Sequence, residues 1–388
     1  IPASYLGFRQ TALGKGSFMN KELEPTYIKQ WVSLPIGSMA LRVGSGVLDS
    51  FSAEMRVAVG HPERCVITYS TSVPDDIVEL LTHDLTTVGF IVKKYPMPDG
   101  EQATSYNQAE KLFSQLAEAG LTGDDLLVAI GDSGVVSSAS FVANAWCGGV
   151  SLVLVPLDLE AATLSCVQPR ALSVMAERPR TITCPGVARY CFVDLDTIPL
   201  GPDDEHANFA RALMVSTAMS ESVTAFSRVW DTADDLREGN LDAMAEQIAD
   251  AIKVRGRLTA SAAIAIRQSV QYGFDFMYAM ERFVPGQSRA ALFADGLRFA
   301  ARISVAKEDL DIDDMLAQDE LLEKLGIGSV TCDISAEQMI AALKAECFRS
   351  TNRFMIVLPL DISRVRLSSV DEDLLCEHAQ AWCDAHRA

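Results

Sequence analysis

The side chains that could do chemistry in this chain begin with a glycine-containing turn at residues 130–138. Its sequence is Ile-Gly-Asp-Ser-Gly-Val-Val-Ser-Ser, between a strand-like apolar run at 126–131 and a helix-like stretch at 137–147. Gly131 and Gly134 could let backbone N–H groups approach a pyrophosphate, whereas Asp132 would place a negative charge beside it. By themselves, these two glycines favour an ordinary strand-to-helix turn over a dinucleotide site.

Metal ligands are the second candidate chemistry, and the histidines are poorly placed for it. The chain has five histidines, and only the C-terminal tail combines them with cysteines at short spacing, at Cys376, His378, Cys383 and His386. Cys376 and Cys383 lie seven residues apart on one face of an expected last helix, which is more typical of a packed helix than of a zinc site. The sequence therefore predicts no metal site built from histidine in the long middle region.

No local motif indicates nucleophilic catalysis. One group of polar residues could form an anion site. The sequence contains no Gly-x-Ser-x-Gly elbow, and no cysteine stands beside a base. Arg267 and Gln271 are four residues apart, share a face of an expected helix, and follow Lys253 in the same helix-rich region. That face could hold an anionic ligand, or it could be solvated surface, as Arg255 and Arg257 nearby would indicate.

The elements that must position these residues fall into two kinds. Strand-like runs at 64–69, 89–93, 126–131 and 150–156 alternate with helix-like stretches at 73–88, 106–119 and 137–147. Continuous apolar strands of this kind predict a parallel sheet covered by helices on both faces. Beyond residue 199 the expected elements are helices, at 208–229, 240–257, 260–283, 288–305 and 335–348, with one late strand at 354–358. We therefore expect an α/β domain at 1–199 and a helical domain at 200–388, joined near the Gly-Pro-Asp-Asp turn.

Composition excludes several classes of partner. The 388 residues include 52 Asp and Glu against 33 Lys and Arg, for a net charge of −19. That balance argues against binding to nucleic acid or to anionic lipid, and no run of 18 apolar residues is present to span a membrane. The nine cysteines are scattered and the first ten residues lack a signal-peptide core. We expect a cytoplasmic protein with reduced thiols that acts on a small molecule.

Several short stretches, taken in order, resemble 3-dehydroquinate synthase and the wider sugar phosphate cyclase superfamily. They are Pro-Asp-Gly-Glu-Gln at 98–102, Leu-Val-Ala-Ile-Gly at 127–131, Val-Leu-Val-Pro at 153–156, Phe-Val-Asp-Leu-Asp-Thr-Ile at 192–198, and shorter matches at 296–302 and 353–354. The resemblance implies an N-terminal Rossmann-like domain that binds NAD, a C-terminal helical domain that carries zinc, and an active-site cleft between them. It also implies a homodimer. Family members oxidise a sugar phosphate transiently with NAD, eliminate phosphate, reduce, and close a carbocycle by aldol addition.

The positions that match the family's zinc ligands hold other residues here. By the resemblance, Arg211 replaces the ligand Glu, Phe274 replaces the first ligand His, and Arg289 replaces the last. A second histidine of the same family motif becomes Tyr278. Guanidinium and phenyl groups do not donate lone pairs to a metal, so we expect no zinc.

The cofactor loop and the pocket are also altered relative to the family. A glycine-rich loop becomes the turn with only Gly131 and Gly134, so we expect no cofactor, although NAD at these two glycines stays open. A Thr-Thr pair becomes Leu157 and Asp158, and an Asp becomes Leu164. The family's substrate contacts are matched by Glu101, Lys253 and Arg267, and by Gln271 in place of an Asn. Leu157, Leu164, Phe274, Met277 and Tyr278 predict a cleft that suits a more apolar substrate.

Three functions follow as hypotheses. The first is a cyclase-like lyase or isomerase, in specialised natural-product biosynthesis, that has lost the redox cycle and promotes ring closure or rearrangement by proximity and polar groups. Its candidate catalytic residues are Asp158, Glu160, Arg211, Asp275, Tyr278 and Arg289, with Asp275 and Tyr278 as acid or hydrogen-bonding groups. The second is an NAD-dependent sugar phosphate cyclase with an atypical site. The third is a non-catalytic homologue that binds a ligand or a partner.

Overall fold

A computed structural model of the chain describes residues 27–57, 62–175 and 179–387. The N-terminal stretch that lacks a signal-peptide core lies outside the described residues. The strands of the main sheet are β1 (Ile28–Ser33), β2 (Ser38–Gly44), β3 (Arg64–Ser70), β4 (Ile91–Met97), β5 (Leu126–Gly131), β6 (Ser151–Pro156) and β7 (Tyr190–Asp194). The helical segments among them are η1 (Val47–Ser50), α1 (Phe51–Arg56), α2 (Asp75–Thr87), α3 (Gly100–Ala103), α4 (Tyr106–Ala119), α5 (Ser133–Ala145), η2 (Trp146–Gly148) and η3 (Ala161–Ser165).

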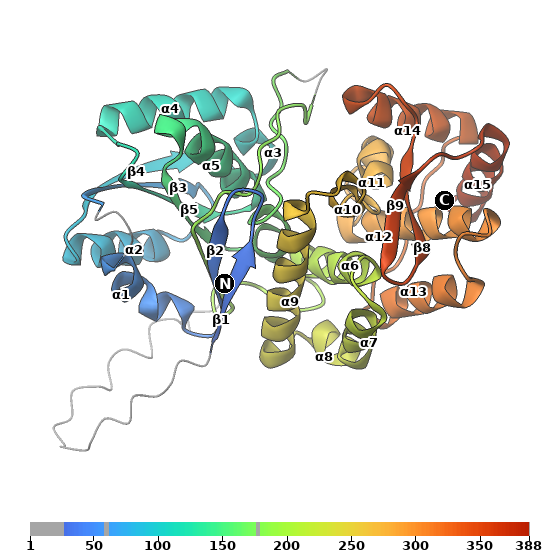
Figure 1. Cartoon of the computed structure of the whole chain (residues 1–388), viewed down its shortest axis with the longest axis horizontal. Helices are drawn as coiled ribbons and strands as arrows, with labels where there is room; N and C mark the ends of the chain where they lie inside the picture. The colour runs from blue at the N-terminus through green and yellow to red at the C-terminus, as the bar shows by residue number, and fades with distance from the viewer. Residues whose placement is uncertain (1–26, 58–61, 176–178, 388) are drawn as a thin grey trace, which may run out of the picture.

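The sheet is mostly parallel, as the continuous apolar runs predict. Within the described residues its strand order is β1-β2-β7-β6-β5-β3-β4, and only the β1–β2 pair is antiparallel. Every residue of β5 is buried. Leu127 and Ala129 of β5 pack in the apolar cluster with α4 and α5, whereas Val128 and Ile130 pack in the cluster with α1 and α2. The two helical layers lie on opposite sides of the sheet in Figure 1.

Helices make up most of the chain after residue 204. They are α6 (Glu205–Met219), α7 (Val223–Asp231), α8 (Ala233–Glu238), α9 (Leu241–Ala260), α10 (Ile264–Ser269), α11 (Phe274–Met280), η4 (Glu281–Phe283), α12 (Arg289–Ala306), α13 (Ile312–Lys324), α14 (Ala336–Ser350) and α15 (Glu372–Ala385). A hairpin of β8 (Ile356–Asp361) and β9 (Arg364–Ser368) packs among them. The expected strand at 354–358 is confirmed, and its partner β9 was not expected from the sequence.

Two expected long helices are each broken in the structure. The stretch 208–229 divides into α6 and α7 because the Ser222 side chain accepts a hydrogen bond from the backbone N–H of Ala225 and starts a new helix. The stretch 260–283 divides at Gly273, whose φ is 88°. A Cβ there would lie 2.7 Å from Leu297 and 2.8 Å from Phe293, so only glycine fits the turn before α11.

The sheet and the helices share one continuous apolar core. The cluster that covers one sheet face extends without a break into α6, α9, α11 and α12. Helix α9 contacts both the β1–β2 hairpin and α6, and it stands between the sheet and the remaining helices in Figure 1. The division of the chain at residue 199 therefore stays a prediction, although the kind of element changes close to that point.

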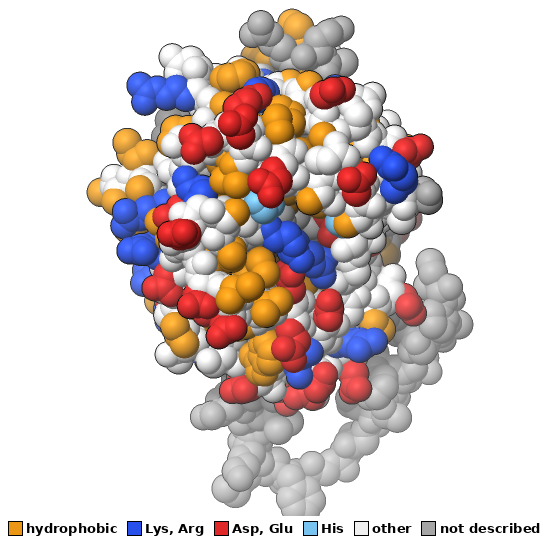
Figure 2. All heavy atoms as spheres, turned by 90° about the vertical axis from the view of Figure 1, so that its right-hand side faces the viewer, with side chains coloured by type: hydrophobic (Ala, Val, Ile, Leu, Met, Phe, Trp, Pro, Cys, Tyr) orange, Lys and Arg blue, Asp and Glu red, His pale blue; other side chains and the backbone are white. Residues whose placement is uncertain are grey.

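The surface carries the acidic balance of the sequence. Figure 2 shows acidic side chains spread over one face of the helical part, with Lys and Arg interspersed and without a large basic patch on the described part of that face. Within the described ranges, no helix is both long enough and apolar enough to cross a membrane.

Candidate functional site

A cavity of about 640 Å³ lies between the segment that follows β6 and the helices α10, α11 and α14. We call it the central cavity. Its lining residues include five that the sequence analysis selected for the site: Leu164, Gln271, Phe274, Asp275 and Tyr278. The volume is in the range that small-molecule sites occupy in proteins.

The walls of the central cavity differ in polarity. Leu164, Phe274, Met355, Val357 and Leu367 line one part with apolar side chains. The remaining lining is largely polar, with the side-chain amides of Gln168, Gln268, Gln271 and Asn352, the carboxyl groups of Asp275 and Glu346, and the guanidinium groups of Arg170, Arg180 and Arg353. The cavity could therefore take a ligand with an apolar body and several hydrogen-bonding groups. Met277, which was expected in the cleft, is buried in the core instead.

Asp275 is the acid that lines this cavity without a partner. It stands on α11, and no ion pair or hydrogen bond joins its carboxyl group to any other described residue. Burial raises the pKa of the Asp275 carboxyl to about 7. Tyr278 follows three residues later on the same helix face and also lines the cavity. A carboxyl group that is half protonated near neutral pH can both accept and return a proton.

Four titratable side chains form a group that we call the acid–base cluster: Asp158, Glu160, His206 and Arg289. The two carboxyl groups are largely buried, whereas the His206 side chain is 46% exposed. Nη1 of Arg289 lies 2.6 Å from Oε2 of Glu160. Nδ1 of His206 lies 3.5 Å from the same oxygen and 3.9 Å from Oδ1 of Asp158. Glu160 is almost fully buried, with 2% of its side chain exposed. Asp158 and Glu160 follow β6, whereas His206 and Arg289 begin α6 and α12, so the cluster joins the sheet to the helices.

The pKa values within the acid–base cluster are strongly displaced. Burial raises the pKa of Asp158 to about 7, against the opposing effect of His206. Burial alone would also raise the pKa of Glu160, but Arg289 and His206 hold it well below its ordinary range. The hydrogen bond to Glu160 raises the pKa of His206 to about 9, although burial opposes this. Near neutral pH, Glu160, His206 and Arg289 are therefore all charged.

His206 was not selected from the sequence. The only sequence signal for it is its place in the first turn of a helix, two residues after Asp204. The Asp204 side chain caps α6 by accepting a hydrogen bond from the backbone N–H of Ala207. This cap orients the first turn, and His206 then meets carboxylates that are more than forty residues away in the sequence.

A chain of alternating charges links the acid–base cluster to the central cavity. Nε of Arg289 lies 3.3 Å from Oε1 of Glu281, and Nη1 of Arg180 lies 3.6 Å from Oε2 of the same residue. Arg180 also pairs with Glu346 at 3.2 Å and stacks over the ring of Tyr278 at 4.2 Å. Because Arg180 and Tyr278 line the cavity, charges in the cluster can influence a ligand bound there.

The structure does not bring Arg211 to this cluster, so its selection as a catalytic residue needs correction. Its guanidinium group is buried and donates hydrogen bonds to the carbonyl oxygens of Leu200 and Leu236 and to the side chain of Asn208. These contacts tie the junction loop and α8 to α6. Two residues earlier, Phe209 points to the opposite side of α6. Its ring packs against Phe274 and lies 5.1 Å from the guanidinium carbon of Arg289.

The residues at the presumed metal position do not fit a divalent cation. Phe209, Phe274 and Phe293 pack ring against ring, with centroid separations of 4.8–6.4 Å. Arg289 presents a positive charge beside them and is already paired with Glu160. Phenyl rings and a guanidinium group supply no lone pair for coordination. Within the described ranges, no three His, Cys, Asp or Glu side chains gather in a way that could hold a metal ion.

The C-terminal tail is not arranged as a zinc site in the described chain. Cys376 is exposed on α15, whereas Cys383 is buried against Met339. The ring of His386 stacks on Trp382, and its Nε2 lies 3.6 Å from Asp295.

The carboxylate of Asp132 occupies the turn that contains Gly131 and Gly134 and accepts hydrogen bonds from nearby backbone N–H groups. Oδ1 of Asp132 accepts a hydrogen bond from the backbone N–H of Val135 at 2.9 Å, and its Oδ2 accepts one from the backbone N–H of Gly100. The helix α5 therefore begins at Ser133, four residues earlier than expected, with Asp132 as its cap. The carboxylate takes up N–H donors that a bound pyrophosphate would need, so this turn does not fit a dinucleotide as it stands.

The two glycines have a packing role that needs no cofactor. A Cβ on Gly131 would collide with Ser70, and a Cβ on Gly134 would collide with the carbonyl oxygen of Gly100. The glycines allow the start of α5 to approach β3 and α3 closely.

We expect the substitution Gly134→Ala to lower the free energy of unfolding by about 1–3 kcal/mol, because backbone atoms must shift to admit the methyl group. Gly201→Ala is the matched control, since no atom lies within 4 Å of its Cβ position. Urea denaturation of both purified variants measures the difference. Equal stability of Gly134→Ala and the unsubstituted protein would contradict the packing role.

Other residues selected from the sequence lie outside the central cavity. Lys253 and Arg267 are exposed, and Arg267 donates hydrogen bonds to the carbonyl oxygens of Ser261 and Ala262. Glu101 is exposed and lies 3.5 Å from Arg170. Leu157 packs among apolar residues that cover the other face of the sheet. Of the expected anion contacts on the helices, only Gln271 reaches the cavity.

Arg255 was interpreted as surface charge, and that interpretation is wrong. It is 1% exposed and has no acidic partner among the described residues. Its guanidinium group donates hydrogen bonds to the side chains of Thr217 and Gln168 and to the carbonyl oxygen of Val270. Burial lowers the pKa of Arg255 to about 10. Because Gln168 lines the cavity with its oxygen turned to Arg255, its amide hydrogens are left for a ligand.

Comparisons with known proteins agree with the fold. Residues 94–171 match the family model described as 3-dehydroquinate synthase N-terminal. The chain is 26% identical over 304 residues to 3-dehydroquinate synthase of Thermobifida fusca (strain YX), which covers 74% of this chain and 77% of that protein. It is 24% identical over 349 residues to the same enzyme of Shouchella clausii (strain KSM-K16), with 86% and 93% covered.

Solved structures show the same architecture. A 2-deoxy-scyllo-inosose synthase complexed with carbaglucose-6-phosphate, NAD⁺ and Co²⁺ superposes with a TM-score of 0.78 at 15% identity, covering 91% of this chain and 100% of that one. The 2-epi-5-epi-valiolone synthase of Streptomyces hygroscopicus subsp. jinggangensis 5008, with NAD⁺ and Zn²⁺ bound, superposes with a TM-score of 0.74 at 13% identity. It covers 89% of this chain and 97% of that one.

Proposed function

The chain is a member of the 3-dehydroquinate synthase and sugar phosphate cyclase superfamily, and from this premise we propose that it catalyses ring closure or rearrangement of a small molecule without NAD and without a divalent metal. The reaction takes place in the central cavity, between residues contributed by the 1–199 and 200–388 parts of the chain. Asp275 transfers the proton, and neighbouring polar groups bind and polarise the substrate.

One observation carries this proposal: the Asp275 carboxyl lines a ligand-sized cavity, has no partner among the described residues, and has a pKa of about 7. A carboxyl group that served only the fold would be paired with a donor, because an unpaired acid in a buried wall costs stability. Acids with a pKa near the operating pH are suited to general acid–base chemistry.

The step that fits these groups is an intramolecular aldol-type closure. The ionised Asp275 takes a proton from the carbon next to a substrate carbonyl, and the electron pair moves into that carbonyl to form an enolate. The enolate carbon attacks a second carbonyl of the same molecule, which forms the new C–C bond and an alkoxide. Asp275 returns its proton to the alkoxide oxygen, so atoms and charge balance without an oxidant. This step corresponds to the closing reaction of the family without its redox cycle.

Hydrogen-bond donors around Asp275 would stabilise the enolate. The amide groups of Gln168 and Gln271 and the hydroxyl of Tyr278 line the same cavity, and Arg255 polarises Gln168 from behind. Fixed donors directed at a developing oxyanion stabilise it more than water does, because they need no reorganisation. The apolar wall of Leu164 and Phe274 would bury the rest of the substrate, so we propose a substrate less polar than a sugar phosphate.

The geometry at the family's metal and cofactor positions supports a reaction that needs neither. Arg289 and Phe274 stand where the resemblance places metal ligands. The positive charge of the Arg289 guanidinium group is neutralised by Glu160. At the α5 turn, Asp132 holds the N–H groups that a pyrophosphate would use. We further propose that the reaction belongs to natural-product biosynthesis. We also expect a homodimer, which light scattering would detect.

The experiment uses the whole protein, treated with EDTA and freed of nucleotides on charcoal. It is incubated with a panel of open-chain dicarbonyl compounds, and their conversion to isomeric rings is followed by mass spectrometry. Turnover without metal or NAD is the expected result. Turnover that appears only after NAD and Zn²⁺ are added would support an atypical NAD-dependent cyclase, favoured by the Glu101 match. If no compound reacts and none raises the melting temperature of the protein, a non-catalytic homologue is favoured.

A further inference from the structure

One cation in the core has no counter-ion in the described part of the chain. The guanidinium group of Arg255, near the end of α9, is buried and forms no ion pair with any described residue. It donates hydrogen bonds to uncharged oxygen atoms of Thr217, Gln168 and Val270, at 3.3, 2.5 and 3.1 Å. Its Nε atom is also buried, without a hydrogen-bond partner among the described residues. Neutral acceptors replace the solvation of a cation only in part, so Arg255 keeps an uncompensated positive charge.

This charge lies behind one wall of the central cavity. Gln168 and Phe274 both contact Arg255 and both line the cavity, and the centre of the Phe274 ring is 5.9 Å from the guanidinium carbon. A guanidinium group can only donate hydrogen bonds, so it holds the oxygen of the Gln168 side chain toward itself and leaves the amide N–H groups for a ligand. Because charges inside a protein are screened less than charges in water, this wall attracts a negative group.

The acidic side chains that line the central cavity do not neutralise Arg255. Glu346 is already paired with Arg180 and with Arg349. Burial raises the pKa of Asp275 and no cation lowers it, so Asp275 and Arg255 do not act as a pair. The chain has a net charge of −19, yet the wall of this cavity lacks the one negative charge that Arg255 requires.

We propose that Arg255 determines the specificity of the central cavity, which selects a ligand that carries one carboxylate on an apolar body. The carboxylate lies at the N–H groups of Gln168, in the field of Arg255, and the apolar body lies against Leu164 and Phe274. The substrate is then a carbonyl compound that also carries a carboxylate. This last assignment rests on the function proposed above, whereas binding of the carboxylate does not.

The single charge of Arg255 favours a carboxylate over a phosphate. A carboxylate brings one negative charge, which matches one desolvated guanidinium group. A phosphate monoester carries between about 1.5 and 2 negative charges at neutral pH and three strong acceptor oxygens, so it needs more donors than the amide of Gln168 supplies. An uncharged ligand of the same shape would leave Arg255 uncompensated.

The test compares 2-naphthoate with 2-naphthamide, two unreactive probes of nearly the same shape of which only the first is charged. Isothermal titration calorimetry on the full chain measures both affinities. The unsubstituted protein should bind 2-naphthoate at least about tenfold more tightly than 2-naphthamide, and more tightly than 2-naphthyl phosphate. Arg255→Met should remove the preference by weakening 2-naphthoate alone. Arg255→Lys keeps the charge and should retain most of the preference.

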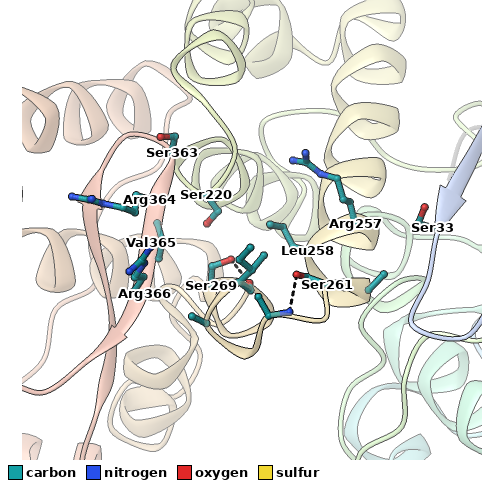
Figure 3. A pocket seen from close by; sticks show the side chains of 14 residues that line it. Ser33, Ser220, Arg257, Leu258, Ser261, Ser269, Ser363, Arg364, Val365 and Arg366 are labelled. Carbon is teal, nitrogen blue, oxygen red and sulfur yellow. Dashed lines mark hydrogen bonds between the residues drawn. The ribbon is translucent and has the colours of Figure 1, made fainter.

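The matched control on the same helix is Arg257→Met. Arg257 is exposed, pairs with Glu221, and lines a separate hollow that it shares with Leu258 (Figure 3). Because no residue of that hollow also lines the central cavity, the control should bind both probes as the unsubstituted protein does.

A further variant supplies the missing charge from the protein itself. Gln168→Glu places a carboxylate beside Arg255, so it should raise the melting temperature of the free protein and abolish the preference for 2-naphthoate. Circular dichroism verifies that each variant is folded. If Arg255→Met is not folded, Arg255→Lys and Gln168→Glu decide the outcome.

Three results would overturn the proposal. They are equal or absent binding of the two probes by the unsubstituted protein, a preference that persists in Arg255→Met, and an equal loss of both probes in Arg255→Met, which is the behaviour of a purely structural residue. Because neither probe reacts, these results are independent of whether the dicarbonyl compounds are turned over, and failure of that turnover leaves the carboxylate preference intact.

Discussion

Replacement of Arg289 by methionine is expected to lower the free energy of unfolding by about 3–5 kcal/mol near neutral pH. The substitution leaves the Glu160 carboxylate, which is 2% exposed, with His206 at 3.5 Å and the electrostatic influence of Arg170, but without its close ion pair. An uncompensated charge in such a site is costly, because the protein cannot replace the lost solvation. The cation stacked on Phe209 is lost as well.

A double-mutant cycle separates the ion pair from the packing. Glu160→Gln combined with Arg289→Met removes both charges, and we expect it to recover at least half of the stability that Arg289→Met loses. Arg228→Met is the matched control, because Arg228 pairs with Asp250 at 3.0 Å on the surface and should cost about 1 kcal/mol or less. Urea unfolding measures the unsubstituted protein, the two single variants Glu160→Gln and Arg289→Met, the double variant and Arg228→Met. A double variant as unstable as Arg289→Met alone would show that the pair is not the source of the loss.

The architecture could be predicted from the sequence because its signals are local. The run at 126–131 is apolar throughout, which requires cover on both faces, and Gly120 ends the preceding helix with a φ of 67°. A break inside an expected helix could not be predicted where it is caused by contacts with residues that are distant in the sequence. The turn at Gly273 is set by Phe293 and Leu297, which come twenty or more residues later.

The candidate site could be predicted only in part, for the same physical reason. Asp275 and Tyr278 were selected because they fall in the stretch that matches the family's histidine motif, and the structure places both at the wall of the cavity. Arg255 was missed because its neighbours in sequence are charged and only the fold buries it. Arg211 was selected by its place in a family motif, yet its side chain faces the opposite side of α6 from Phe209. A match to a motif position does not determine where a side chain points.

The two altered regions of the scaffold have a common physical feature. At the α5 turn, the Asp132 carboxylate stands where a phosphate would be held, and beside Phe274 the Arg289 guanidinium stands where a cation would be held. In each place a side chain of the chain itself supplies the charge that a cofactor or metal would bring. Both charges therefore belong to side chains that are paired within the fold, Asp132 with backbone N–H groups and Arg289 with Glu160.

Asp275→Asn is expected to reduce turnover of a responsive dicarbonyl compound by about 100- to 10,000-fold, because the amide cannot transfer the proton. The same substitution should stabilise the protein in a pH-dependent way. The pKa of Asp275 is about 7 in the folded chain, whereas the ordinary pKa of an aspartate carboxyl is 3.8. As the pH rises between these values, the unfolded state releases the proton and the folded state retains it. The ordinary protein therefore loses stability progressively over this range. Above about pH 7 both states are ionised, and the loss does not increase further.

The stability advantage of Asp275→Asn over the unsubstituted protein should therefore grow by about 2–3 kcal/mol from about pH 5 to about pH 8, at about 1.4 kcal/mol per pH unit below the folded pKa. Urea unfolding at several pH values measures the difference, in which the titrations of Asp158 and His206 cancel because both proteins contain them. Asp203→Asn, at an exposed carboxyl, should show no such growth. A variant that loses turnover with no pH-dependent gain in stability would mean that Asp275 is ionised in the folded protein at neutral pH, and the proton transfer would then need another acid.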